Sequence, residues 1–221
     1  MTEISDEKEG PCGPRRGRPP KGSENTRRTA LLAAAEEVFL EKGLAASMDD
    51  IAKRAGVSKK TIYGCVATKE LLFAGVIHAR IENSQVHHLP ETVAGAREIE
   101  EALVQFFVQL ARFVLSPPSV RLYRTVAAEA TRFPELARTY YEEGPVHMIN
   151  IVGAWLEARI REGWLAIDEP YEAASILGGS VIAAPLRNLT LEIAGADDEA
   201  VIEKRARATV RYFLNGALAK R

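Results

Sequence analysis

The 221-residue sequence has few of the residues that build disulfide frameworks and metal sites, with only two cysteines, Cys12 and Cys65, and four histidines. Two cysteines make no disulfide framework and fit a reducing cytoplasm. No Cys, His or carboxylate cluster has the spacing of a metal site. No apolar run approaches the roughly 18 residues of a membrane span, and the acidic N-terminus lacks the apolar segment of a secretion signal. We therefore expect a cytoplasmic protein with no membrane span, metal or other cofactor.

Catalytic motifs are also missing from the chain. There is no Gly-rich phosphate loop, no Ser/His/Asp arrangement in a recognisable context and no defensible pair of buried acids. Hydrophobic residues at 47% and charged residues at 27% describe an ordinary globular protein. These observations disfavour an enzyme, and we expect the protein not to be one.

The formal net charge of −1 hides an uneven distribution along the chain. Residues 11–70 carry 12 Lys and Arg against 7 Asp and Glu, whereas residues 71–221 carry 16 against 19. A positive N-terminal part beside a mildly acidic remainder indicates that one end of the molecule meets a polyanion.

One stretch organises this positive part, and it reads SMDDIAKRAGVSKKTIYGCVATKEL from Ser47 to Leu71. Ser47 and Ser58 each precede an amphipathic segment and can cap its free N–H groups, and Asp50 completes a capping-box pattern. Gly56 stands where the first helix must stop and the chain must reverse. The pattern predicts a helix-turn-helix, which presents the N-terminal end of its second helix to the DNA major groove. The alternative is an ordinary helical hairpin within a bundle.

The string IAKRAGVSKKTIY at positions 51–63, followed by TKELL, resembles the DNA-binding domain of the TetR/AcrR family of transcriptional repressors. The resemblance implies a three-helix domain over residues 24–70 that binds a double-stranded DNA operator, and a connecting helix within residues 71–90. The sequence predicts that this helix runs from Lys69 to about His88. Carried over position by position, it also implies the DNA contacts. Phosphate contacts are expected for Ser47, Ser58, Thr61, Tyr63 and Lys69, and groove-facing positions for Lys59 and Lys60.

The sequence departs from the family pattern at Gly64, Cys65 and Val66, where aromatic or His residues are usual. Gly64 costs the short helix about 1 kcal/mol relative to Ala. Cys65 replaces a side chain that often contacts DNA, which leaves the docking mode intact but changes the expected operator sequence. A small half-buried thiol is the expected state of Cys65, and a redox sensor activated by nearby lysines is the alternative.

Residues 1–23 have no periodic apolar pattern, and we expect them to be disordered when free. Within them, Arg16-Gly17-Arg18-Pro19 resembles an AT-hook. An extended Arg-Gly-Arg fits the narrow minor groove of A·T tracts, so Arg16 and Arg18 are expected to bind there. The alternative is a generic basic tail that raises only non-specific affinity.

The apolar pattern of residues 91–221 predicts a bundle of helices separated by proline and glycine. The expected helices are 96–115, 118–130, 134–143, 145–162, 170–193 and 198–219. The segment from Val126 to Ala137 resembles the regulatory domain of one branch of the same family. The resemblance implies a pocket for a small lipophilic inducer, although core packing explains most bulky residues equally well. The candidate lining residues are Phe106, Leu110, Phe113, Tyr123, Val126, Met148, Ile151 and Trp155, with Glu129 or His147 as a polar handle.

The last two helices carry apolar stripes, which include Ile176 in the first and Val201, Val210, Phe213, Leu214 and Leu218 in the second. The resemblance implies that these two helices of each chain form a four-helix interface in a homodimer. A two-fold dimer would read two half-sites of a palindrome. The sequence thus predicts an all-α protein with a three-helix helix-turn-helix domain followed by a helical ligand-binding and dimerisation domain. Its predicted function is a repressor released by a lipophilic inducer. The alternative is a constitutive or architectural AT-rich DNA-binding protein without a ligand.

Overall fold

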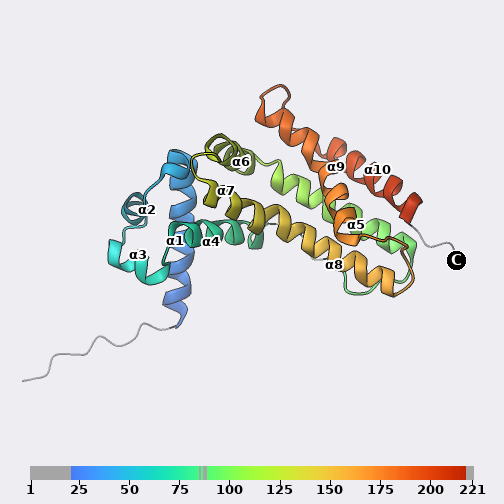
Figure 1. Ribbon diagram of the computed structural model, residues 1–221, viewed down its shortest axis with the longest axis horizontal. Coiled ribbons are helices and arrows are strands. Elements are labelled where there is room, and N and C mark those ends of the chain that lie inside the picture. Colours follow the sequence, from blue (N-terminus) through green and yellow to red (C-terminus); the bar gives the residue numbers. More distant parts are fainter. Residues whose placement is uncertain (1–20, 85, 87–88, 218–221) are drawn as a thin grey trace, which may run out of the picture.

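The computed structural model describes residues 21–84, 86 and 89–217, and all regular elements within them are helical, which confirms the all-α class (Figure 1). The N-terminal part contains α1 (Lys21–Lys42), the 3-10 turn η1 (Gly43–Ala45), α2 (Met48–Arg54), α3 (Lys59–Cys65) and α4 (Lys69–Glu82). The C-terminal part contains α5 (Ala96–Val114), α6 (Pro117–Glu129), α7 (Pro134–Tyr141), the π-helical turn η2 (Glu142–Val146), α8 (His147–Arg161), α9 (Pro170–Thr190) and α10 (Glu199–Ala217).

Two predicted helix boundaries are wrong. α4 ends at Glu82 and not near His88, because Asn83 already closes the last turn through its N–H bond to the carbonyl of Ala79. The predicted break at Gly144 and Pro145 is instead the π-helical turn η2, which joins α7 to α8 without a loop. A wider π turn tolerates the missing proline N–H, since such turns often interrupt the regular α-helical hydrogen bonding.

Among the described residues, Gly43, Gly56 and Gly163 adopt the left-handed conformation that side chains rarely accept. Gly43 (φ 69°) ends α1, and Gly56 (φ 65°) turns the chain between α2 and α3. Gly56 was predicted as a helix stop, and the absence of a Cβ is what permits the left-handed conformation there.

The N-terminal core is not confined to the helix-turn-helix. Buried residues of α1, α2, α3 and α4 pack in one cluster with Leu122 and Val126 of α6 and with Leu136 of α7. The α6–α7 pair therefore packs directly on the N-terminal domain and joins it to the bundle.

A second core fills the C-terminal bundle. α8 packs along α9, and α10 packs against α5 and α9, so that α9 and α10 lie side by side at the edge furthest from α2 and α3 (Figure 1). Part of the stripe predicted for a dimer interface lies in this core, because Val210 and Leu214 of α10 are buried within their own chain. Leu218 of the same stripe lies outside the described residues.

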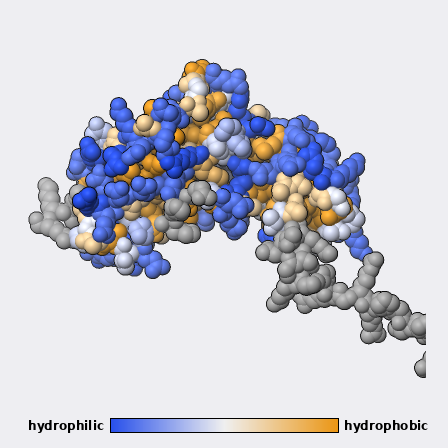
Figure 2. Space-filling view, turned by 180° about the vertical axis from the view of Figure 1, so that it is seen from behind, coloured by the Kyte–Doolittle hydropathy of each residue, from blue (hydrophilic) through white to orange (hydrophobic). Residues whose placement is uncertain are grey.

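Other apolar residues of these two helices remain on the surface. Ile176 on α9 and Val201 on α10 are exposed, as are Leu191 and Ile193 in the connection between them. Figure 2 shows hydrophobic surface at the tip of the molecule, where this connection lies. In the part of the chain that the structure describes, no single helix has the length and apolar character to cross a membrane, although two sharply bent helix pairs pass the same test together.

Candidate nucleic-acid interface and ligand cavity

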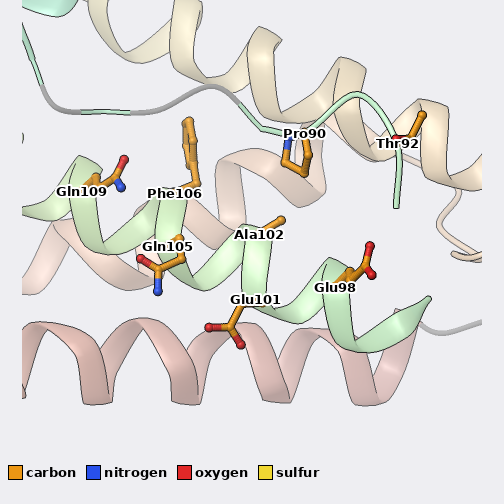
Figure 3. Close-up of a pocket in the computed structure, with 8 residues that line it drawn as sticks. All are labelled: Pro90, Thr92, Glu98, Glu101, Ala102, Gln105, Phe106 and Gln109. Atoms are coloured by element: carbon orange, nitrogen blue, oxygen red, sulfur yellow. The ribbon is translucent and has the colours of Figure 1, made fainter. Parts of the chain in front are cut away.

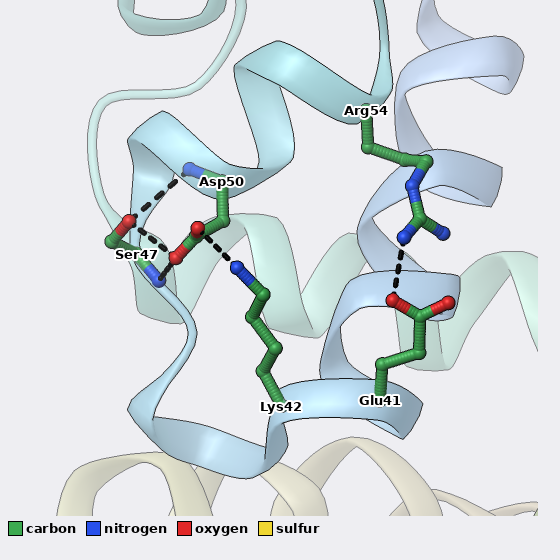
Figure 4. A network of polar contacts seen from close by, with 5 residues as sticks. All are labelled: Glu41, Lys42, Ser47, Asp50 and Arg54. Carbon is green, nitrogen blue, oxygen red and sulfur yellow. Dashed lines mark hydrogen bonds and ion pairs between the residues drawn. The ribbon is translucent and has the colours of Figure 1, made fainter.

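The predicted capping box fixes the start of α2. The Ser47 hydroxyl accepts a hydrogen bond from the Asp50 N–H at 3.1 Å, and the Asp50 carboxylate accepts one from the Ser47 N–H at 3.0 Å. Lys42 at the end of α1 also donates to this carboxylate (Figure 4). The Lys42 and Ser47 hydrogen bonds hold the pKa of Asp50 well below its usual range.

A second ion-pair group ties α2 to α1. Arg54 donates to Glu37 at 2.8 Å and to Glu41, and these bonds raise the pKa of Arg54 and lower that of Glu41 (Figure 4 draws the Glu41 pair). Exposed pairs of this kind contribute little to stability individually. Together with the Lys42–Asp50 pair they connect α2 to α1 by side-chain contacts.

α3 presents a polar face to solvent and one apolar residue to the core. Ile62 is fully buried, whereas the candidate contacts Ser58, Lys59, Lys60, Thr61 and Tyr63 are all exposed. Ser58 caps the helix by accepting the Thr61 N–H at 3.1 Å, and the two hydroxyls lie 2.8 Å apart. The seven residues of α3 therefore form a small protruding surface of hydroxyls, lysines and a phenol, the groups that bind phosphates and base edges.

The two groove-facing lysines differ in their surroundings. The Lys59 ammonium lies 3.0 Å from the Asp49 carboxylate of α2, and this bond raises the Lys59 pKa. Lys60 has no hydrogen bond or ion pair to any other described residue. A cation with no protein partner loses nothing when it moves to a phosphate, so Lys60 is the stronger candidate for a DNA contact.

Lys69, a predicted phosphate contact, is half-buried and forms hydrogen bonds within the protein. Its ammonium donates to the carbonyl oxygen of Leu44 at 2.7 Å and to that of Ala46 at 3.3 Å, and it lies 4.9 Å from the centroid of the Phe133 ring. Burial lowers the pKa of Lys69. The side chain thus points into the junction between α4, η1 and the α6–α7 connection, and it stabilises that junction.

The residues that depart from the family pattern lie at the end of α3. Val66 is half-buried and packs on the N-terminal core, as expected. Cys65 is exposed, so the expectation of a half-buried thiol is wrong. The AT-hook-like residues Arg16 and Arg18 lie outside the described residues.

A cavity of about 550 Å³ opens between the two cores. α4, α5, α6, α7, α8 and α9 all contribute to its wall, which is mainly apolar. Four of the candidate ligand-binding residues line it: Leu110, Phe113, Tyr123 and Met148. This size and composition match those of sites that bind small apolar molecules.

Three of the other candidate residues belong to the junction with the N-terminal domain or to the surface. Val126 packs in the N-terminal core. Glu129 abuts Gly43, where a Cβ would clash with its carboxylate, and one of its oxygens is buried without a hydrogen-bond partner among the described residues. His147 is exposed, and its ring centroid lies 6.4 Å from that of His78 on α4. Neither predicted polar handle therefore lines the cavity.

The last three candidates face the bundle core or a separate hollow. Trp155 donates its indole N–H to the Pro90 carbonyl at 2.7 Å and packs in the C-terminal core. Ile151 packs at the edge of the same core. Phe106 lies in a second hollow of about 370 Å³ between α5 and the segment that precedes it (Figure 3).

Most polar groups of the cavity wall were not predicted from the sequence: Arg80, Ser119, Tyr140, Tyr141, Ser175, Arg187 and Thr190. The sequence does contain a signal for Arg80, because this residue follows Leu72 and Val76 at four-residue spacing on the apolar face of α4. A charge on such a face is uncommon and needs a partner. The Thr190 hydroxyl is buried without a partner among the described residues, so it can bond a ligand.

The short exposed helices α2 and α3 are joined by a tight turn, α3 is cationic, and a helical domain with a mainly apolar cavity follows them. This combination defines a DNA-binding regulator of transcription. Comparison with known proteins gives the family. Residues 31–76 match bacterial regulatory proteins of the tetR family, and residues 101–216 match the C-terminal domain of AefR-like transcriptional repressors. The chain belongs to the TetR family of bacterial transcriptional regulators, as the sequence predicted.

Individual relatives agree with this assignment. The HTH-type transcriptional activator FasR of Mycolicibacterium smegmatis is 31% identical, over 81% of this chain and 90% of its own. The structure of the flavonoid-responsive regulator FrrA is 35% identical with a TM-score of 0.72, covering 89% of this chain and 100% of its own. The structure of a TetR-family regulator from Mesorhizobium loti is 27% identical with a TM-score of 0.73, and the match covers 89% of this chain and 98% of that regulator's chain.

Proposed function

We propose that this protein is a ligand-responsive repressor that binds a palindromic operator as a homodimer and is released by a small lipophilic inducer. The observation that carries the proposal is the cavity of about 550 Å³, whose wall includes α4, the helix that directly follows α3. A ligand in that cavity contacts an element of the DNA-binding domain, which is what coupling between the two sites needs. A constitutive or architectural protein has no use for such a cavity, and an enzyme would need a catalytic group there.

The ligand class is supported by the cavity wall and by one relative. Rings of Phe107, Phe113, Tyr123 and Tyr140 contribute to the wall. FrrA, which is 35% identical, is described as flavonoid-responsive. An aromatic, lipophilic inducer is therefore the proposed effector. Repression is the proposed direction of control, although FasR is described as an activator.

The homodimer is proposed to form through α9 and α10. Their exposed Ile176 and Val201, and the apolar connection between the two helices, are surfaces that a second copy would cover. One short recognition helix of seven residues gives one chain little affinity, and a two-fold dimer doubles the contacts. The protein is proposed to act in the cytoplasm, where its operator lies.

The first prediction tests the dimer and the palindrome together. Selection of full-length protein on random duplex DNA should enrich inverted repeats whose half-site centres lie about 34–36 Å apart, one helical turn. Light scattering should give about twice the mass of one chain, because two copies form the binding unit. A monomer that selects single, unrepeated sites with high affinity contradicts the two-half-site proposal.

The second prediction concerns the N-terminal arm, with Arg16 and Arg18 proposed as minor-groove contacts. Replacing both by alanine should lower affinity and reduce the salt slope by about 2, one per lost cation contact. The loss should be larger on operators with A·T-rich flanks, because the guanine amino group and a wider groove obstruct the arm elsewhere. Binding titrations on both flank types at several salt concentrations measure this. An equal loss on both would reduce the arm to a generic basic tail.

A further inference from the structure

Arg80 is a charged residue in the wall of a mainly apolar cavity. It lies on α4, on the face whose other residues, Leu72 and Val76, are buried. The side chain is only 12% exposed and lines the cavity. A charge held this far from water is costly unless other groups bind it, so its partners decide what the cavity can accept.

The partners of Arg80 come from both halves of the molecule. One terminal nitrogen donates to the Glu36 carboxylate on α1, and the other donates to the Ser119 hydroxyl on α6 at 2.7 Å. The guanidinium carbon lies 5.6 Å from the centroid of the Phe113 ring on α5. Arg80 therefore connects the first helix of the DNA-binding domain, the ligand cavity and the C-terminal bundle.

The guanidinium has hydrogen-bonding capacity left over. An arginine carries five N–H donors in a planar fork that suits acidic oxygens. The bonds to Glu36 and Ser119 use two of them within the described residues. The other charged group in the wall, Arg187, is exposed at the far end of α9, so Arg80 is the enclosed cation.

The surroundings of Arg80 are aromatic. The rings of Tyr123 and Tyr140 lie 6.3 Å apart between their centroids, and both line the cavity together with Phe113. Burial raises the pKa of Tyr140 to about 12, so its phenol is neutral and can donate a hydrogen bond at neutral pH. Much of the remaining wall is apolar and includes Met148, Ile149 and Ile182.

We propose that the cavity selects a lipophilic aromatic ligand that carries an acidic oxygen, a carboxylate or a phenolate, and that Arg80 binds this oxygen in competition with Glu36. The proposal rests on the ligand-responsive function proposed above and names the class of its ligand. The ligand's oxygen and the Glu36 carboxylate repel each other at one guanidinium. Binding therefore weakens the Arg80–Glu36 pair that ties α4 to α1, and a ligand that favours the separated state shifts the population of the DNA-binding domain.

A pair of probes tests this in the full-length protein: biphenyl-4-carboxylate and its neutral amide, biphenyl-4-carboxamide, titrated by calorimetry. The wild-type protein should bind the carboxylate about tenfold or more tightly than the amide, the size of one charge-assisted hydrogen bond. Arg80→Gln should remove that preference, so that the carboxylate and the amide bind with similar affinity. Arg187→Gln, which removes the other cavity arginine, should retain it.

Glu36→Gln is a second test. It keeps Arg80, and it removes the Glu36 carboxylate that Arg80→Gln would leave without its partner. It should tighten carboxylate binding several-fold, because the competitor is gone, and leave amide binding unchanged. An unchanged carboxylate affinity would overturn the competition. A preference lost in Arg187→Gln but kept in Arg80→Gln, or no binding of either probe by the wild type, would overturn the proposal itself.

The same titrations separate this inference from the function on which it rests. The selected operator is added, and its release is followed by fluorescence anisotropy. Equal binding of carboxylate and amide, with equal operator release, would overturn the role of Arg80 while supporting a ligand-responsive regulator. Preferential carboxylate binding through Arg80 without any operator release would support the ligand class and contradict the proposed response.

Discussion

Arg159→Ala is expected to lower the free energy of unfolding by about 3 kcal/mol, because it removes the most buried charged side chain of the described residues. Arg159 is 2% exposed and donates to the Pro90 carbonyl at 3.3 Å, the Glu91 carbonyl at 2.7 Å and the Glu162 carboxylate at 2.7 Å. Its guanidinium also lies 4.9 Å from the ring of Trp155. Truncation leaves the carbonyls without this donor and opens a cavity beside the indole.

Thermal unfolding followed by circular dichroism measures this effect. For a chain of this size, 3 kcal/mol corresponds to a fall in melting temperature of roughly 6–12 °C. Arg161→Ala is the matched control, since Arg161 is exposed on the same helix and its loss should change stability by less than about 0.5 kcal/mol. Equal melting temperatures for the two variants would show that the segment at Pro90 and Glu91 does not depend on Arg159.

The helix-turn-helix could be predicted from the sequence because its signals are local. A capping box joins residues three apart, and the Ser47 and Asp50 bonds that it requires are present. The turn at Gly56 needs only a left-handed residue between two apolar runs, and it has φ 65°. Neither feature depends on contacts with residues far along the chain.

The existence of a ligand cavity could be predicted from the sequence, but the residues that line it could not. Apolar periodicity gives the buried face of a helix, but a core and a cavity wall are equally apolar. Val126 and Trp155 therefore carry the same signal as Leu110 and Met148, although only the latter two line the cavity. The difference depends on tertiary contacts, such as the bond of Trp155 to Pro90.

Lys69 illustrates the same limit for a polar residue. Its local sequence, after the cap Thr68, matches a family position that contacts phosphate. The structure brings the Leu44 and Ala46 carbonyls and the ring of Phe133 to its ammonium, from positions far along the chain. A pattern around residue 69 contains no information about a ring at residue 133.

Lys60→Ala combined with Tyr63→Ala is expected to abolish most specific DNA binding while leaving the fold intact. Lys60 and Tyr63 project from α3 into solvent, and Tyr63 remains 46% exposed. A lost base-edge or phosphate contact costs about 1–3 kcal/mol, so the two together should weaken binding by about 30-fold or more if they act independently. Lys60→Ala alone should also reduce the salt slope by about 1.

The measurement is fluorescence anisotropy with the selected operator at several salt concentrations, with melting curves to check the fold. Because Ile62 alone anchors this part of α3 in the core, the double variant should melt as the wild type does. Arg161→Ala is the matched control: it removes one positive charge from the exposed surface of α8, outside both α3 and the proposed dimer interface, and should bind DNA normally. If the control weakens binding as much as the α3 variants, the effect is one of overall charge. If the α3 variants bind with wild-type affinity, another surface contacts DNA.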